Sequence, residues 1–148
     1  MNQSSKSTHI TLWANRMIFA VVFGLLFFLP RLLDWYAAIR LLNPGQEKAI
    51  VTAFYCCAAV ILYALICMEK LLKNILRYEV FTGANVGLIR KVCLCCGLVG
   101  LICLPAGLFY PPLIFLSVIM GFLCLVVNVV CQVIQAAVTL REENDLTI

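Results

Sequence analysis

The stretch Arg77–Lys91, RYEVFTGANVGLIRK, separates two long apolar runs near the middle of the chain. It has basic side chains at both ends, and its centre holds Thr82, Gly83 and Asn85. Glycine and asparagine favour turns and helix ends, and Thr82 or Asn85 could cap a helix by accepting a backbone N–H. The stretch therefore predicts the end of one helix, a turn and the start of the next.

The residues on both sides of this stretch are too apolar for a soluble domain. The 148 residues are 64% apolar and 12% charged, whereas soluble domains average about 25% charged residues. A helix crosses a bilayer with roughly 20 mostly apolar residues. The sequence predicts a single all-α domain of four transmembrane helices, at about 12–33, 49–77, 85–104 and 112–140, with a tail at 141–148.

The remaining joints carry turn signals. Pro30 is expected to kink or end the first helix, because proline cannot continue the helical hydrogen-bond ladder. Asn43-Pro44-Gly45 predicts a turn before the second helix. The uncharged stretch Pro105–Pro112 predicts a tight hairpin at the membrane surface.

The distribution of Lys and Arg predicts the orientation. Eight of the basic residues fall on the side of the two termini and of the central turn, and three fall on the other side. Cytoplasmic loops carry the excess of Lys and Arg. Both termini and the central turn are therefore expected in the cytoplasm. Glu69 and Lys73 also form a favourable i,i+4 pair on the helix that enters the turn.

Polar and small residues recur along the fourth apolar run at helical spacing. They are Ser117, Gly121, Cys124, Asn128, Gln132, Gln135 and Thr139. The third run has a matching set, Cys93, Gly97, Gly100, Cys103 and Gly107. Small residues and interhelical hydrogen bonds drive helix association in lipid. We expect the two faces to meet or to line the centre of a bundle. The amides then join helices; alternatively, they line a polar ligand site. The small-residue faces also allow a homodimer.

The sequence offers little support for catalysis. All nine cysteines lie in apolar runs, which is typical of small buried thiols. Cys93-x-x-Cys96 has the spacing of a redox or metal pair, but a zinc site needs four ligands and the only histidine is His9. No catalytic residues, metal or cofactor are predicted. The scattered net charge of +4 does not predict direct nucleic-acid binding.

Two stretches carry a resemblance to a known family: Leu71–Val92, LLKNILRYEVFTGANVGLIRKV, and the terminus Leu140–Ile148, LREENDLTI. They resemble the YoaS-like family of small bacterial membrane proteins, a family of unknown function (DUF2975). In that family a basic helix end leads into a Phe-Thr/Ser turn, and the chain ends in an Asp-Leu-Thr motif. The matching positions here are Phe81, Thr82, Asn85, Ile89, Arg90, Glu143, Asp145, Leu146 and Thr147.

The resemblance implies a four-helix protein of the bacterial inner membrane with both termini inside. It also implies a partner, because members are often encoded beside a small helix-turn-helix regulator. We therefore expect a non-enzymatic sensor or regulatory protein whose central turn and tail form one interaction motif. Its expected residues are Phe81, Thr82, Asn85, Arg90, Glu143, Asp145, Leu146 and Thr147. The alternative is a small transporter or toxin-immunity protein that uses the polar face of Ser117, Asn128, Gln132 and Gln135.

Overall fold

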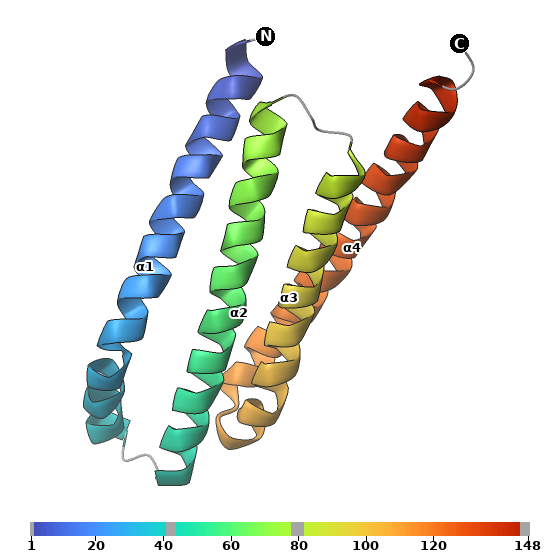
Figure 1. The fold of residues 1–148 in the computed structure, drawn as a ribbon. Helices are drawn as coiled ribbons and strands as arrows, with labels where there is room; N and C mark the ends of the chain where they lie inside the picture. Colours follow the sequence, from blue (N-terminus) through green and yellow to red (C-terminus); the bar gives the residue numbers. More distant parts are fainter. Residues whose placement is uncertain (1, 41–43, 78–81, 146–148) are drawn as a thin grey trace.

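Four long helices make up the computed structural model, which describes residues 2–40, 44–77 and 82–145. Side chains are described for these residues except 2–7, 33, 36–40, 44, 142 and 145. The helices are α1 (Asn2–Arg40), α2 (Pro44–Leu76), α3 (Gly83–Phe109) and α4 (Pro112–Asp145), shown in Figure 1. Each contains a segment long and apolar enough to cross a membrane. The prediction of an all-helical fold with four such helices is confirmed.

The helices are longer than expected, because apolar character marks only the part of a helix that lies in lipid. Pro30 lies inside α1, which continues to Arg40, and Figure 1 shows a bend in its lower part. Pro44 is the first residue of α2, where a missing N–H is harmless. Asn43 lies outside the described residues.

The hairpin between α3 and α4 is tighter than predicted. α3 continues through Pro105, and only Tyr110 and Pro111 separate the two helices. The Tyr110 N–H donates to the Ala106 carbonyl at 3.0 Å, and the Leu113 N–H donates to the Tyr110 carbonyl at 3.0 Å. These bonds close the last turn of α3 and open the first turn of α4.

The helices form a row rather than a bundle around one centre. Among the described residues, backbone contacts join α1 to α2, α2 to α3 and α3 to α4, and Figure 1 shows this order. An apolar cavity of about 200 Å³ lies within the row and is lined by residues of all four helices. The core beside it includes Cys57, Val99 and Cys103. Each helix therefore leaves much of its surface exposed, and the apolar membrane-spanning candidate segment of α4 is less buried than those of the other three helices.

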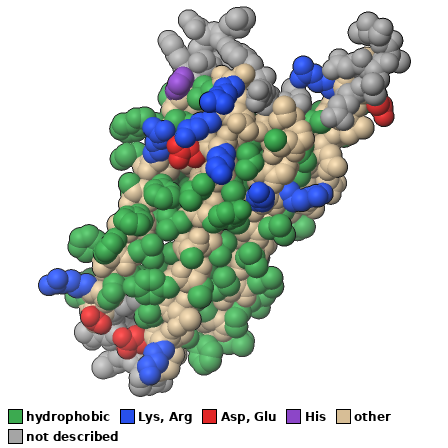
Figure 2. Space-filling model, in the orientation of Figure 1, with side chains coloured by type: hydrophobic (Ala, Val, Ile, Leu, Met, Phe, Trp, Pro, Cys, Tyr) green, Lys and Arg blue, Asp and Glu red, His purple; other side chains and the backbone are tan. Residues whose placement is uncertain are grey.

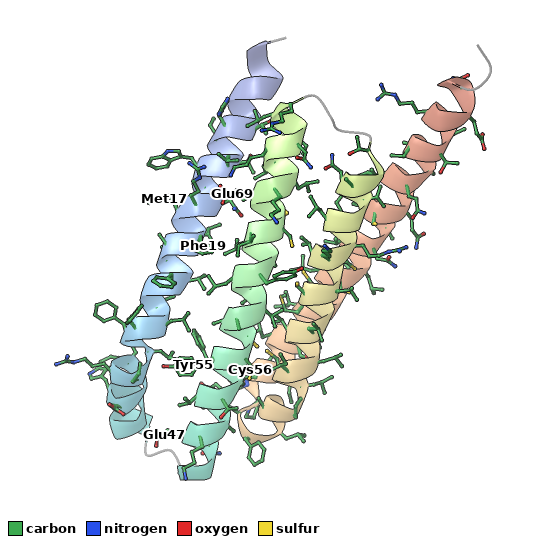
Figure 3. All side chains as sticks on the ribbon, viewed as in Figure 1. Met17, Phe19, Glu47, Tyr55, Cys56 and Glu69 are labelled. Carbon is green, nitrogen blue, oxygen red and sulfur yellow. The ribbon has the colours of Figure 1, made fainter. Side chains whose placement is uncertain are left out.

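Charged residues mark two levels along the row. Figure 3 shows Glu69 near the end that carries both chain termini and Glu47 at the opposite end of α2. We call these the terminal end and the loop end. The helix between Arg90 and Phe109 of α3 is about 28 Å long at ~1.5 Å per residue. That length is close to the ~30 Å hydrocarbon thickness of a bilayer, so this part of α3 is long enough to cross it.

Small residues bring α3 and α4 together, as the sequence predicts. A Cβ placed on Gly107 would lie 2.5 Å from Ile114 Cγ1, and one on Gly100 would lie 3.4 Å from the Ser117 carbonyl oxygen. The Ser117 hydroxyl donates to the Gly100 carbonyl at 2.8 Å. Cys103 is the exception in the predicted set, because its sulfur faces Cys57 of α2 at 3.7 Å.

Candidate functional site at the terminal end

The turn between α2 and α3 contains the first part of the predicted interaction motif. Thr82 precedes α3 with extended backbone angles, as an N-cap residue should, but its side chain makes no capping bond. Its backbone carbonyl accepts instead from the N–H groups of Asn85 (3.0 Å) and Val86 (3.3 Å). Of the two predicted capping residues, Thr82 is at the capping position without the predicted side-chain bond, and Asn85 lies inside α3. Phe81 lies outside the described residues.

Asn85 is the most buried polar residue of this region. Only 1% of its surface is exposed, and its Oδ1 accepts a hydrogen bond from Asn74 Nδ2 of α2 at 2.7 Å. The bond holds the first turn of α3 against the last turns of α2. The sequence singled out Asn85 but not Asn74.

A second set of polar contacts joins α1 to α2 at the same level. The buried Asn15 side chain donates to the Leu65 carbonyl at 3.2 Å. Arg16 and Glu69 form an ion pair at 3.1 Å, and Lys73 reaches the same carboxylate at 3.0 Å. The i,i+4 pair predicted between Glu69 and Lys73 is therefore confirmed. These side chains fix the relative height of α1 and α2.

Basic side chains gather on one face of the row at the terminal end (Figure 2). The exposed Lys and Arg residues near this level, which we call the basic face, are Arg16, Lys70, Lys73, Arg77, Arg90 and Lys91. Arg16 and Lys73 share the single carboxylate of Glu69, which balances one of their two positive charges. The other four form no salt bridge with any described side chain. They are therefore available to an external anion.

The opposite face of the row has a different character at this level. An apolar groove of about 330 Å³ runs between α2, α3 and α4. Its walls are Met68, Leu71, Ile75, Asn85, Ile89, Val92, Val127, Val130 and Ile134. At 100° per residue, Ile89 and Arg90 point to different faces of α3. The groove and Arg90 therefore lie on opposite faces of the row, and no pattern in the sequence indicated the groove.

The polar stripe of α4 meets α3 only in part. Ser117 is buried against α3, and the Cys124 thiol donates to the Cys93 carbonyl at 3.4 Å. Asn128, Gln132 and Gln135 are exposed, and their side chains form no hydrogen bond to a described residue. Within this row, the amides do not join helices as predicted, nor do they line the centre of a bundle.

The repeat of the interface explains this difference. The α4 residues that bond to α3 recur every seven positions, at Ser117, Cys124 and Cys131. The polar stripe instead follows an 11-residue repeat. At 100° per residue, positions seven apart shift by about −20° around the helix and positions eleven apart shift by about +20°. The interface and the polar stripe therefore coincide near Ser117 and lie on diverging faces of α4 toward the terminal end.

The C-terminal part of the predicted motif is only partly described. α4 extends to Asp145, and Glu143 is exposed. The side chain of Asp145 and all of Leu146 and Thr147 lie outside the described residues. The pairing of this tail with the central turn stays a prediction.

The thiols lie mainly between helices. Cys57, Cys67, Cys95, Cys103 and Cys131 are buried, and Cys56 is exposed. The Cys93 and Cys124 sulfurs face each other across α3 and α4 at 3.5 Å, and the Cys131 thiol donates to the Val86 carbonyl at 3.8 Å. Within the described part of the chain, no group of three or more His, Cys, Asp or Glu side chains is placed to hold a metal ion.

Fold and charge together define an α-helical protein with the make-up of a multi-pass membrane protein. The chain belongs to the family described as "Protein of unknown function (DUF2975)", whose model matches residues 4–148. The prediction of the DUF2975 family from the central turn and the terminal motif is thus confirmed over almost the whole chain, while the YoaS-like label stays a prediction. A comparison with curated proteins finds no match. A comparison with solved structures finds none either.

Proposed function

We propose that this protein is a non-enzymatic regulatory protein of the bacterial inner membrane. Both termini and the central turn face the cytoplasm, where the basic residues concentrate. There the protein holds a small helix-turn-helix regulator, and a change in the membrane-embedded helices alters that contact.

The extension of α4 is the observation that carries this proposal. Cys131 bonds to Val86 of α3, so the first residue of α3, Gly83, lies level with α4 near residue 134. α4 continues to Asp145, which is about 16 Å farther at ~1.5 Å per residue. Figure 1 shows this extension projecting past the start of α3. It offers a helical surface that a cytoplasmic protein can reach without entering the bilayer.

The acidic end of the extension favours a basic partner. Glu142, Glu143 and Asp145 follow Arg141 in the sequence. Complementary charge steers association and sets partner choice more than it raises affinity. A DNA-binding regulator has a basic surface, so binding at this tail would compete with its binding to DNA.

The test is co-purification of the tagged protein from its own cells in mild detergent, followed by mass spectrometry. Wild type is compared with a chain that ends at Arg141 and with the variant Asp145→Ala. The proposal expects a small DNA-binding protein with wild type and its loss from both altered chains. The variant Asp34→Ala, which removes a carboxylate at the loop end, is the matched control and should retain the partner. A partner that stays bound after truncation would reject the tail as its binding site.

The alternative of a small transporter or immunity protein depends on the α4 amides, which are exposed on the side of the row. A transport or resistance phenotype lost in Asn128→Leu/Gln132→Leu, with the protein still folded and inserted, would support it. A phenotype unchanged by both substitutions would reject it.

A further inference from the structure

We propose that Arg90 of α3 and the amides Asn128 and Gln132 of α4 form a binding site for the headgroup of an anionic phospholipid. The site lies on the basic face, where α3 and α4 meet. This inference is independent of the proposed regulatory function, because it concerns the bilayer side of the molecule and not the projecting tail.

The antiparallel register places Arg90 and Asn128 at one height and Gln132 one helical turn away. Gly100 contacts Ser117, Cys93 contacts Cys124, and Val86 contacts Cys131. A decrease of seven in residue number along α3 therefore corresponds to an increase of seven along α4. Arg90 is therefore level with Val127 and Asn128, and Gln132 lies one turn closer to the terminal end.

Helical geometry places them on one face of the row as well. Relative to Cys93, Arg90 is rotated by about 60° at 100° per residue. Relative to Cys131, Asn128 is rotated by about 60° and Gln132 by about 100° in the same sense. Because the helices are antiparallel, these rotations point to the same side. The groove residues Ile89 and Val127 are rotated the opposite way, in agreement with their shared position in the apolar groove.

The chemistry of the three side chains suits a phosphate ester. A guanidinium presents five N–H donors and binds phosphate in a bidentate manner. Each amide adds two N–H donors and a carbonyl oxygen that can accept a hydrogen bond from a glycerol hydroxyl. Arg90 has no salt bridge to a described side chain, and the two amides have no side-chain hydrogen bond within the described residues. All three groups therefore have free capacity at the same place.

The depth of the site points to a lipid rather than to a dissolved anion. Arg90 lies about 28 Å along α3 from Phe109, which matches one hydrocarbon thickness. A headgroup phosphate is held at this level by its acyl chains. Exposed apolar residues of α3 and α4, such as Leu94 (62% exposed) and Leu125 (65% exposed), continue from this level toward the loop end. They provide a surface for the acyl chains of the same lipid.

The experiment measures lipid binding by native mass spectrometry of delipidated protein titrated with phosphatidylglycerol. The variants are Arg90→Gln and Asn128→Leu/Gln132→Leu. Arg31→Gln is the matched control, because it also removes one exposed positive charge but lies at the loop end. We expect about a tenfold weaker affinity for Arg90→Gln, a severalfold weaker affinity for the amide variant, and less than a twofold change for Arg31→Gln. Thermal unfolding in detergent confirms that each variant is folded.

Two further titrations identify the source of the phosphate. Phosphatidylcholine tests the charge of the headgroup, and glycerol 3-phosphate tests whether the acyl chains are needed. Wild type should bind phosphatidylglycerol more tightly than either phosphatidylcholine or glycerol 3-phosphate.

Equal loss of affinity in Arg90→Gln and Arg31→Gln would overturn the site, since both residues would then act only through their positive charge. Equal binding of phosphatidylcholine, or full competition by millimolar glycerol 3-phosphate, would overturn the proposed ligand. If Arg90→Gln fails to fold, Arg90→Lys keeps the test open, because it retains the charge and loses the bidentate geometry.

Discussion

The two halves of the α3–α4 interface use the same pair of helices in different ways. Near the loop end, Gly107 and Gly100 allow the backbone of α4 to approach closely, and Ser117 bonds to a backbone carbonyl. Near the terminal end, thiols occupy the interface while Asn128 and Gln132 are exposed beside it. The first half is a packing interface whose polar groups are satisfied internally. In the second half, the side-chain amides of Asn128 and Gln132 form no hydrogen bond within the described residues.

The largest expected effect is in the loop-end half. Gly107→Val should destabilise the protein by about 3 kcal/mol, because a Cβ there would lie 2.5 Å from Ile114 Cγ1 and 3.0 Å from the Ile114 nitrogen. Unfolding of the purified protein in mixed micelles with rising SDS measures this change. Gly121→Ala is the control, because its Cβ would meet nothing within 4 Å. Equal stability of the two variants would show that the close approach at the hairpin is absent.

The next effect concerns the link between the central turn and α2. Asn85→Leu should destabilise the fold by about 2 kcal/mol, because it removes a fully buried amide and leaves the Asn74 side chain without this bond. A double-mutant cycle with Asn74→Ala, read by the same SDS titration, isolates the pair. Strictly additive effects would mean that the two amides do not interact in the bilayer.

Ser117→Ala should have a smaller effect, about 1 kcal/mol. It removes one hydrogen bond to the Gly100 carbonyl, and such bonds contribute little in membranes because the separated helices find other partners. Asn128→Ala, at an exposed position with no hydrogen bond to a described residue, should leave the unfolding midpoint unchanged. A larger loss of stability for Asn128→Ala than for Ser117→Ala would show that the terminal-end half of the interface, and not the loop-end half, depends on its polar side chains for stability.

The smallest effect is expected for the ion pairs of Glu69. Glu69→Gln should destabilise the protein by less than about 1 kcal/mol, because the carboxylate and its partners are partly exposed. The difference from wild type should shrink as salt is raised, since mobile ions screen exposed charges. Thermal unfolding at low and high ionic strength measures it. A difference that does not depend on salt would assign the role of Glu69 to packing.

The sequence predicted the helices well and their ends less well. Apolar length identifies the part of each helix inside lipid, so α1 and α4 were drawn too short where they pass into a polar environment. The pairing of Gly100 and Gly107 with α4 followed from small residues at helical spacing. The Asn74–Asn85 bond was missed because two polar residues near a turn look alike whether they face water or each other.

The composition and the positions of Gly, Pro, Lys and Arg determined four apolar helices, a tight final hairpin and the family of the chain. These features are local, and a bilayer imposes them on any sufficiently apolar segment. The tertiary structure alone decided that the helices form a row, that the interface follows a seven-residue repeat, and that Asn128 and Gln132 are exposed beside that interface. Those outcomes depend on how two helices cross, and a few degrees of rotation per turn move a side chain from an interface to an exposed surface.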